Sequence, residues 1–235
     1  MFNPNAQLRV EAFEDRYTCI VVDDALRDPD QLVRYAAAHR DAFRPAATAY
    51  PGVSLAAPAD VANDLAAYFA LQVRRRFDAR RLVNLNCVLS MVTVPPAALR
   101  PAQWLCHSDL LTLDPRQSIQ ASVLYLFKDD TLGGTSFYST TRSPQETARM
   151  FDDAMRLSPA AFTQRYAITP GYMLGSNQYF RQVGSIAARW NRLIFYDGSV
   201  LHSGDIAAPE KLTSDPLTGR LTLNGFFTCR KNLLR

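Results

Sequence analysis

Cysteine is scarce in this sequence, and the few cysteines lie far apart. The four are Cys19, Cys87, Cys106 and Cys229. No two of them form the C-x-x-C pair of a zinc knuckle. We therefore expect no cysteine-based zinc site. We expect the thiols to be buried hydrophobic groups in a reducing, cytoplasmic environment.

Long apolar runs, a positively charged leader and internal repeats are also lacking. We therefore expect no membrane insertion. The net charge of +4, from 26 Lys and Arg against 22 Asp and Glu, does not require a nucleic-acid partner. The basic run at 74–81 predicts the end of a solvated helix, and attraction of anionic substrates is the alternative. The expected partner is a small-molecule or peptide substrate, and the sequence indicates no particular oligomeric state.

The length and the hydrophobic pattern predict one domain, 1–235, with two contrasting parts. The 235 residues are 48% hydrophobic, which is enough for a substantial core. Residues 1–83 are predicted to form a mainly helical layer, with helices starting near Asp28 and after Pro58. Short apolar runs fill 84–230, with a helical insertion near 144–166, which predicts a mainly β sandwich or barrel with flanking helices. Residues 135–138 are expected to return as the hairpin partner of 119–127.

Histidine is scarce too, so each of the three histidines can be assigned. His39 ends the first predicted helix, where an imidazole interacts favourably with the helix dipole. His107 and Asp109 stand two apart on a predicted extended segment, so their side chains point to the same face. His202, in another apolar strand, is the histidine best placed to complete the set. Two histidines and one carboxylate form the facial triad of non-haem Fe(II) oxygenases, whereas a polar strand end is the alternative for His107 and Asp109.

A strand with one polar face follows His202 in the sequence. In RLTLNGFF, the alternation places Arg220, Thr222, Asn224 and Phe226 on one face. An arginine and a threonine on one face suit a carboxylate, because guanidinium binds carboxylates bidentately. An edge strand with a polar outer face is the alternative interpretation.

Four motifs, taken together, resemble the Fe(II)/2-oxoglutarate-dependent oxygenases. They are HSD, SVLYLFKDDTLGGTSFY, NRLIFYDGSVLHSGD and GRLTLNGFF, in that order within residues 84–230. The resemblance is greatest to the prolyl-4-hydroxylase-like branch and its small bacterial relatives. It implies a double-stranded β-helix, a cupin-like jelly roll, behind an N-terminal helical layer.

The resemblance also implies roles for six residues. His107, Asp109 and His202 would hold Fe(II), and Arg220 would bind the distal carboxylate of the co-substrate 2-oxoglutarate. Thr222 and Tyr125 would assist Arg220. O2 would be the oxidant, and the presence of Asp109 implies hydroxylation rather than halogenation.

The sequence therefore predicts a 2-oxoglutarate-dependent dioxygenase that hydroxylates a C–H bond of an amino acid, a peptide or another small metabolite. A non-catalytic, cupin-like metal- or ligand-binding module is one alternative. A zinc-dependent hydrolase with Asp205 as general base is another. Trp104, Phe137 and Tyr138 are candidates for lining the site, with ordinary core packing as the alternative.

Overall fold

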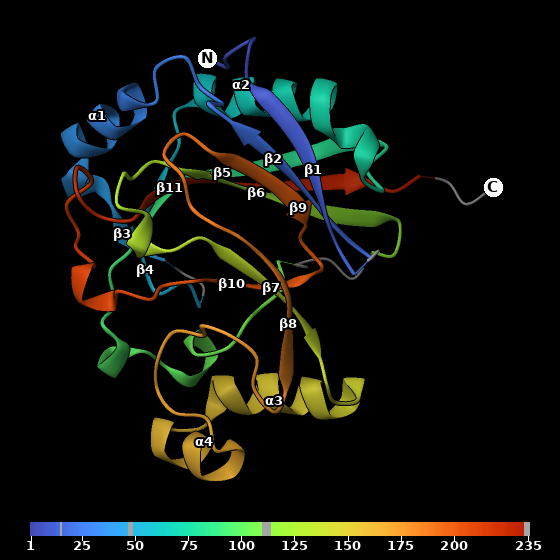
Figure 1. The fold of residues 1–235 in the computed structure, drawn as a ribbon, viewed down its shortest axis with the longest axis vertical. Helices are drawn as coiled ribbons and strands as arrows, with labels where there is room; N and C mark the ends of the chain where they lie inside the picture. Colours follow the sequence, from blue (N-terminus) through green and yellow to red (C-terminus); the bar gives the residue numbers. More distant parts are fainter. Residues whose placement is uncertain (15, 47–48, 110–113, 233–235) are drawn as a thin grey trace.

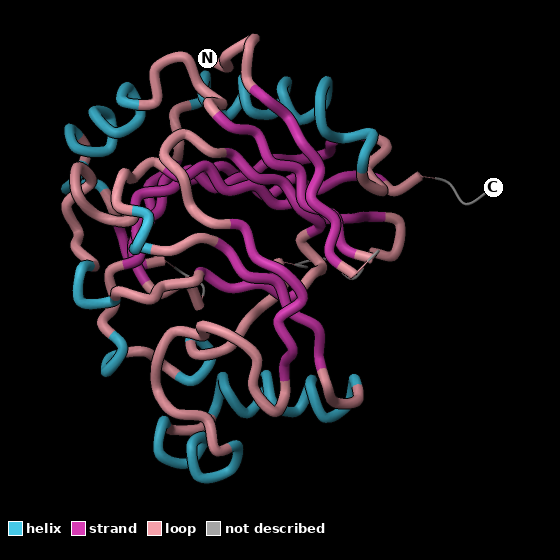
Figure 2. The backbone as a smooth tube through the Cα atoms, viewed as in Figure 1, coloured by secondary structure: helices cyan, strands magenta, loops and turns pink. Residues whose placement is uncertain are grey.

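The computed structural model describes residues 1–14, 16–46, 49–109 and 114–232. Its strands form two antiparallel sheets that face each other (Figures 1 and 2). The larger sheet has the order β1-β2-β9-β6-β11-β5-β4-β3, and the smaller has the order β10-β7-β8. This arrangement is consistent with a double-stranded β-helix. The strands of the large sheet are β1 (Gln7–Phe13), β2 (Tyr17–Asp23), β3 (Arg44–Pro45), β4 (Gly52–Ala56), β5 (Arg81–Val92), β6 (Gln117–Tyr125), β9 (Leu193–Asp197) and β11 (Leu221–Arg230); those of the small sheet are β7 (Thr135–Thr140), β8 (Phe180–Ile186) and β10 (Leu201–Gly204).

Two helices cover the outer face of the large sheet (Figure 1). They are α1 (Asp30–Ala38) and α2 (Ala59–Tyr68), which continues as a π turn and a 3-10 turn to Arg76. Apolar side chains at helical spacing, such as Val61 and Leu65 of α2, lie in one core cluster with Leu223 and Phe227 of β11. The alternation of β11 therefore directs its leucines toward the helices and its polar side chains toward the small sheet.

Two further helices cover the outer face of the small sheet, and they form the helical insertion that the sequence predicts near 144–166. They are α3 (Pro144–Arg156) and α4 (Pro159–Tyr166). Ser143 caps α3, and Glu146 completes a capping box with it. Met150 and Phe162 pack with Tyr138 and Trp104 in a cluster on this outer face. Trp104 and Tyr138 therefore belong to that cluster, whereas Phe137 faces the interior between the sheets.

The N-terminal part contains more strand than its sequence indicates. Residues 1–83 include the two expected helices, but also β1 to β4, which extend both edges of the large sheet. The residues of β2 from Cys19 to Asp23 are buried, because β2 pairs with β1 and β9 and lies between α1 and the small sheet. A short apolar run of this kind has no helical or alternating period that would identify it as a strand.

The expected hairpin of 119–127 with 135–138 is wrong. Strand β6 pairs with β11 and β9 in the large sheet, whereas β7 pairs with β10 and β8 in the small one. Gly133 and Gly134 allow the crossing between sheets. Gly133 has φ +85, and a Cβ there would stand 1.6 Å from the carbonyl oxygen of Asp205, which only glycine avoids.

No helix in the part of the chain that the structure describes is both long and apolar enough to cross a membrane.

Candidate metal centre

The three predicted metal ligands lie together, because two distant segments pair as strands. His107 and His202 form an isolated antiparallel bridge, with N–O distances of 2.9 and 2.8 Å in the two directions. The backbone N–H of Asp109 donates to Gly198 at 2.7 Å, at the turn that precedes β10. One ligand atom of each of His107, Asp109 and His202 lies within 4.8 Å of the others. This donor set fits a facial triad.

The Asp109 carboxylate is directed at both imidazoles. Its Oδ2 lies 3.3 Å from Nε2 of His202, and its Oδ1 lies 3.7 Å from Nε2 of His107. Asp109 is 9% exposed, and among the described residues its Oδ2 accepts no well-aligned hydrogen bond. A buried carboxylate oxygen without a donor is costly unless a cation binds it. The carboxylate therefore fits a bound metal.

A second set of contacts fixes the orientation of His202. Its Nδ1 is 2.9 Å from the carbonyl oxygen of Val200, so Nδ1–H donates there and Nε2 keeps its lone pair. The ring of Tyr196 packs edge-on against the imidazole, with 4.7 Å between centroids. Burial raises the pKa of Tyr196 well above its ordinary value, and Asp109 adds to this, so the phenol stays neutral. The imidazole thus presents Nε2, the atom that faces Asp109.

Charge within the cluster outweighs burial in setting the pKa of Asp109 and of His202, but not that of His107. Burial alone would raise the pKa of Asp109, but the two histidines lower it. Burial likewise disfavours a charge on His202, yet the Asp109 carboxylate and the Val200 carbonyl raise its pKa. Desolvation and the neighbouring His202 lower the pKa of His107, although 57% of that side chain is exposed. The cluster therefore combines an ionised carboxylate with an open-sided imidazole.

Arg220 lies just before β11, and it is a buried cation without an acidic partner. It is 5% exposed, and no ion pair among the described residues involves it. Its Nε donates to Leu132 at 2.9 Å, and its Nη2 donates to Gly133 and Gly134 at 3.1 and 3.0 Å. No hydrogen bond of the described residues uses Nη1. Backbone carbonyls therefore already occupy Nε and Nη2 of the guanidinium, so Arg220 cannot bind a carboxylate with two free nitrogens as expected. Nη1 remains available to an anion.

The other two expected co-substrate residues lie beside Arg220. Thr222 pairs with Tyr125 across β11 and β6, so both side chains share the face that meets the small sheet. The Tyr125 hydroxyl hydrogen-bonds Thr135 of β7 at 2.8 Å, which joins the two sheets. Burial raises the pKa of Tyr125, and the nearby charge of Arg220 opposes this increase. The structure thus brings Arg220, Thr222 and Tyr125 together.

Two tyrosines near Arg220 are absent from the sequence-based expectation. Burial raises the pKa of Tyr50 to about 12, whereas Arg220 and the Thr222 side chain lower it, which places Tyr50 beside both. Tyr172 lies near Tyr50 and Arg220, and its hydroxyl donates a hydrogen bond to the Val94 carbonyl at 2.6 Å. Both tyrosines stand in irregular segments, where neither periodicity nor a motif indicates a role.

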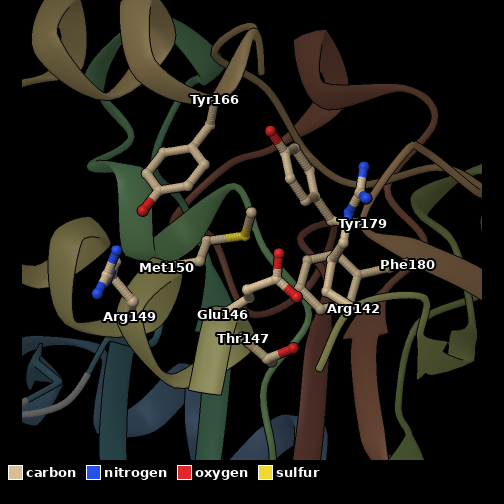
Figure 3. Close-up of a pocket in the computed structure, with 8 residues that line it drawn as sticks. All are labelled: Arg142, Glu146, Thr147, Arg149, Met150, Tyr166, Tyr179 and Phe180. Carbon is tan, nitrogen blue, oxygen red and sulfur yellow. The ribbon is translucent and has the colours of Figure 1, made fainter. Parts of the chain in front are cut away.

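Two hollows on the surface of the described residues are lined by none of the three triad residues. One of about 270 Å³ lies against α3 (Figure 3), and its lining includes Met150 and Phe180 of the outer cluster. In that view Arg142 lies over the ring of Tyr179, 5.4 Å from its centroid. Another, of about 260 Å³, is lined by Trp104 and residues of the 167–178 segment. Because the first lies on the outer face of the small sheet, that sheet separates it from His202.

The comparisons with known proteins identify a family and a fold. The model described as "Family of unknown function (DUF6445)" matches residues 4–227. The chain belongs to this family. No curated protein matches.

Two solved structures align with most of this chain. HygX from Streptomyces hygroscopicus, solved with nickel and 2-oxoglutarate bound, is 11% identical with a TM-score of 0.51, over 94% of this chain and 85% of HygX. The non-haem alpha-ketoglutarate-dependent epimerase SnoN from nogalamycin biosynthesis is 13% identical with a TM-score of 0.48, over 93% of this chain and 82% of SnoN. At these identities the similarity to HygX concerns the fold alone.

Proposed function

We propose that this protein is a non-haem Fe(II)- and 2-oxoglutarate-dependent dioxygenase that hydroxylates a C–H bond of an amino acid, a peptide or another small metabolite. The observation that carries the proposal is the position of a buried, acid-free arginine beside the same strand that carries a triad ligand. HygX, whose fold is similar, binds nickel and 2-oxoglutarate. The four sequence motifs favour the prolyl-4-hydroxylase-like branch and a jelly-roll core.

Strand β10 runs from the metal triad to the part of the proposed site that contains Arg220. His202 and Gly204 are two residues apart on one face, which corresponds to about 7 Å along a strand. A Cβ at Gly204 would lie 3.5 Å from Nη2 of Arg220. A five-carbon dicarboxylate is long enough to reach from the triad toward Nη1 of Arg220. Glycine at 204 keeps the space between them open.

When bound, iron and 2-oxoglutarate would supply the oxidising chemistry. The residues of the chain would bind and orient. His107, Asp109 and His202 would occupy one side of the metal and leave its other positions free. Arg220, with Thr222 and Tyr125, would fix the far carboxylate, so that the co-substrate has one orientation.

The hydrolase alternative receives no support from the position of Asp205. Gly204 faces the interior, so the alternation of β10 turns Asp205 outward. Its carboxylate accepts a hydrogen bond from Ser136 at 3.1 Å, on the face of the small sheet that carries the outer cluster. A general base for metal-bound water must reach the metal. Asp205 does not meet this condition.

Succinate release tests the proposal. The full chain with Fe(II), ascorbate and 2-oxoglutarate in air is expected to form succinate, and a panel of amino acids, peptides and small metabolites should raise the rate. An Asp109→Ala variant provides the matched control, because it lacks the carboxylate ligand but retains both imidazoles. If neither protein releases succinate although both bind metal, the non-catalytic alternative is preferred. If both release succinate equally, Asp109 is not a ligand of the reacting metal, and the proposed site is wrong.

A further inference from the structure

Three carboxamides line the part of the large sheet that lies beside the candidate metal centre. Asn84 and Asn86 belong to β5, and Asn224 belongs to β11. The register pairs Thr228 with Asn84 and Phe226 with Asn86, while Asn224 pairs with Val88. Because alternate residues share a face, these side chains lie on the same face as Thr222, which faces the small sheet. They form a strip, named here the asparagine floor: Asn84, Asn86, Asn224, Phe226 and Thr228.

Backbone contacts connect the asparagine floor to the triad. Thr228 pairs with Ile119 of β6, whose carbonyl accepts from Gly198 at 2.8 Å. Gly198 in turn accepts from the Asp109 backbone at 2.7 Å. In the next row, Phe226 pairs with Ala121, which pairs with Tyr196, the residue that contacts His202. Two successive rows of the floor are therefore connected, through neighbouring strands, to Asp109 and to His202.

The amide groups of the floor have no protein partner among the described residues. Asn84 and Asn86 are exposed, whereas Asn224 is only 8% exposed. No hydrogen bond of the described residues uses any of the three side-chain amides. Neither amide atom of Asn224 is among the fully buried, unpartnered side-chain atoms of the described residues, so both remain accessible although most of the side chain is buried. The amide of Asn224 is therefore free to bind a ligand that lies on the strip.

The chemistry of the floor specifies the ligand. A carboxamide offers two donors and an acceptor with no charge, so it pairs with groups that both donate and accept. The three rows that contain Asn84, Asn86 and Asn224 hold no charged residue on β5, β11 or β6. Phe226 adds an apolar surface between the amides. The next row on this face holds Arg230, whose guanidinium already forms an ion pair with Asp114 at 3.2 Å. Within the three rows themselves, a carboxylate or ammonium group would find no countercharge.

We propose that the asparagine floor binds the substrate through an uncharged hydrogen-bonding group, an amide or a hydroxyl, adjacent to the carbon that reacts. Asn86 and Asn224 flank Phe226 and supply the contacts. This inference rests on the proposed function, and it favours acylated or peptide-like molecules and polyols over free amino acids.

Paramagnetic line broadening tests the inference without a known substrate. The full chain is loaded with Mn(II) and saturated with 2-oxoglutarate, and the proton linewidths of N-acetylglycinamide, glycerol, glycine and acetate are compared. We expect the amide or the polyol to broaden several-fold more than glycine and acetate. Broadening of the amide alone identifies an acylated or peptide-like substrate, and broadening of glycerol alone identifies a polyol.

Substitutions assign the effect to the floor. Asn86→Leu and Asn224→Leu keep the side-chain shape without its donors and acceptors, so the selective broadening should disappear in each. Asn63→Leu, at an exposed asparagine of α2 on the opposite side of the large sheet, is the matched control and should keep it. If Asn224→Leu does not fold, the exposed Asn86 still provides the test.

The outcomes separate the two proposals. Equal broadening of all four probes, stronger broadening of glycine or acetate, or no change in the two leucine variants overturns the asparagine floor while 2-oxoglutarate is still broadened. Failure of Mn(II) to broaden 2-oxoglutarate itself overturns the proposed function, and the inference with it.

Discussion

Replacing Arg220 by methionine should weaken both the fold and the binding of 2-oxoglutarate. Methionine retains the apolar stem but removes the charge and every donor. The carbonyls of Leu132, Gly133 and Gly134 would lose their partner in a buried site. At the lower limit of about 1 kcal/mol for each unsatisfied group, the free energy of unfolding falls by roughly 3 kcal/mol. At about 2–4 °C per kcal/mol for a chain of this size, the midpoint of thermal unfolding falls by roughly 6–12 °C.

The loss of affinity follows from the nitrogen that remains available. A hydrogen bond to a charged group contributes about 1.5–3 kcal/mol, so the dissociation constant for 2-oxoglutarate should rise roughly 10- to 150-fold. Isothermal titration of Zn(II)-loaded protein measures this constant, and urea unfolding measures stability. Arg75→Met, at an exposed arginine outside the ion pairs of the described residues, should change neither. A stable Arg220→Met variant with wild-type affinity would refute the reasoning, and lost stability with unchanged affinity would reduce Arg220 to a structural role.

Two further predictions concern the backbone and acid stability. Gly133→Ala should prevent folding, or lower the unfolding midpoint far more than Gly171→Ala does. Both glycines have positive φ, but only at Gly133 would the added methyl group collide with Asp205. Similar circular dichroism melts for the two variants would contradict this. Burial would raise the pKa of Asp23, but Arg192 and other cations outweigh burial and lower it. Ionised Asp23 therefore stabilises the fold above about pH 4, and this contribution is lost as the pH falls through the lowered pKa. Asp23→Asn should therefore cost about 1.5–3 kcal/mol at pH 7 and less at pH 3 in urea unfolding; a cost independent of pH would exclude this linkage.

Local patterns predicted the features that depend on local chemistry. The helical insertion at 144–166 carries its own caps at Ser143 and Ser158, so α3 and α4 lie where expected. Spacing of two on an extended segment was enough to place His107 and Asp109 on one side, and the structure adds His202 through strand pairing.

Features that depend on contacts between sheets were not predictable in this way. Nothing in residues 119–138 distinguishes a hairpin from a crossing between two sheets, because the distinction depends on the partners of β7. The same holds for the carbonyls that surround Arg220 and for Tyr50, which reach the site from segments far away in sequence. Such neighbours are defined by the packed fold and leave no periodic signal.

The visible absorption of the anaerobic complex tests the central claim most directly. Addition of Fe(II) and 2-oxoglutarate to the full chain should produce the weak metal-to-ligand charge-transfer band of a chelated 2-oxoacid. His107→Ala, Asp109→Ala and His202→Ala should each abolish or strongly weaken the band, whereas His39→Ala, at the end of α1, should leave it unchanged. A band of wild-type intensity in the triad variants, or no band in the wild type with Fe(II) bound, would contradict the assignment of this cluster as the iron and 2-oxoglutarate site.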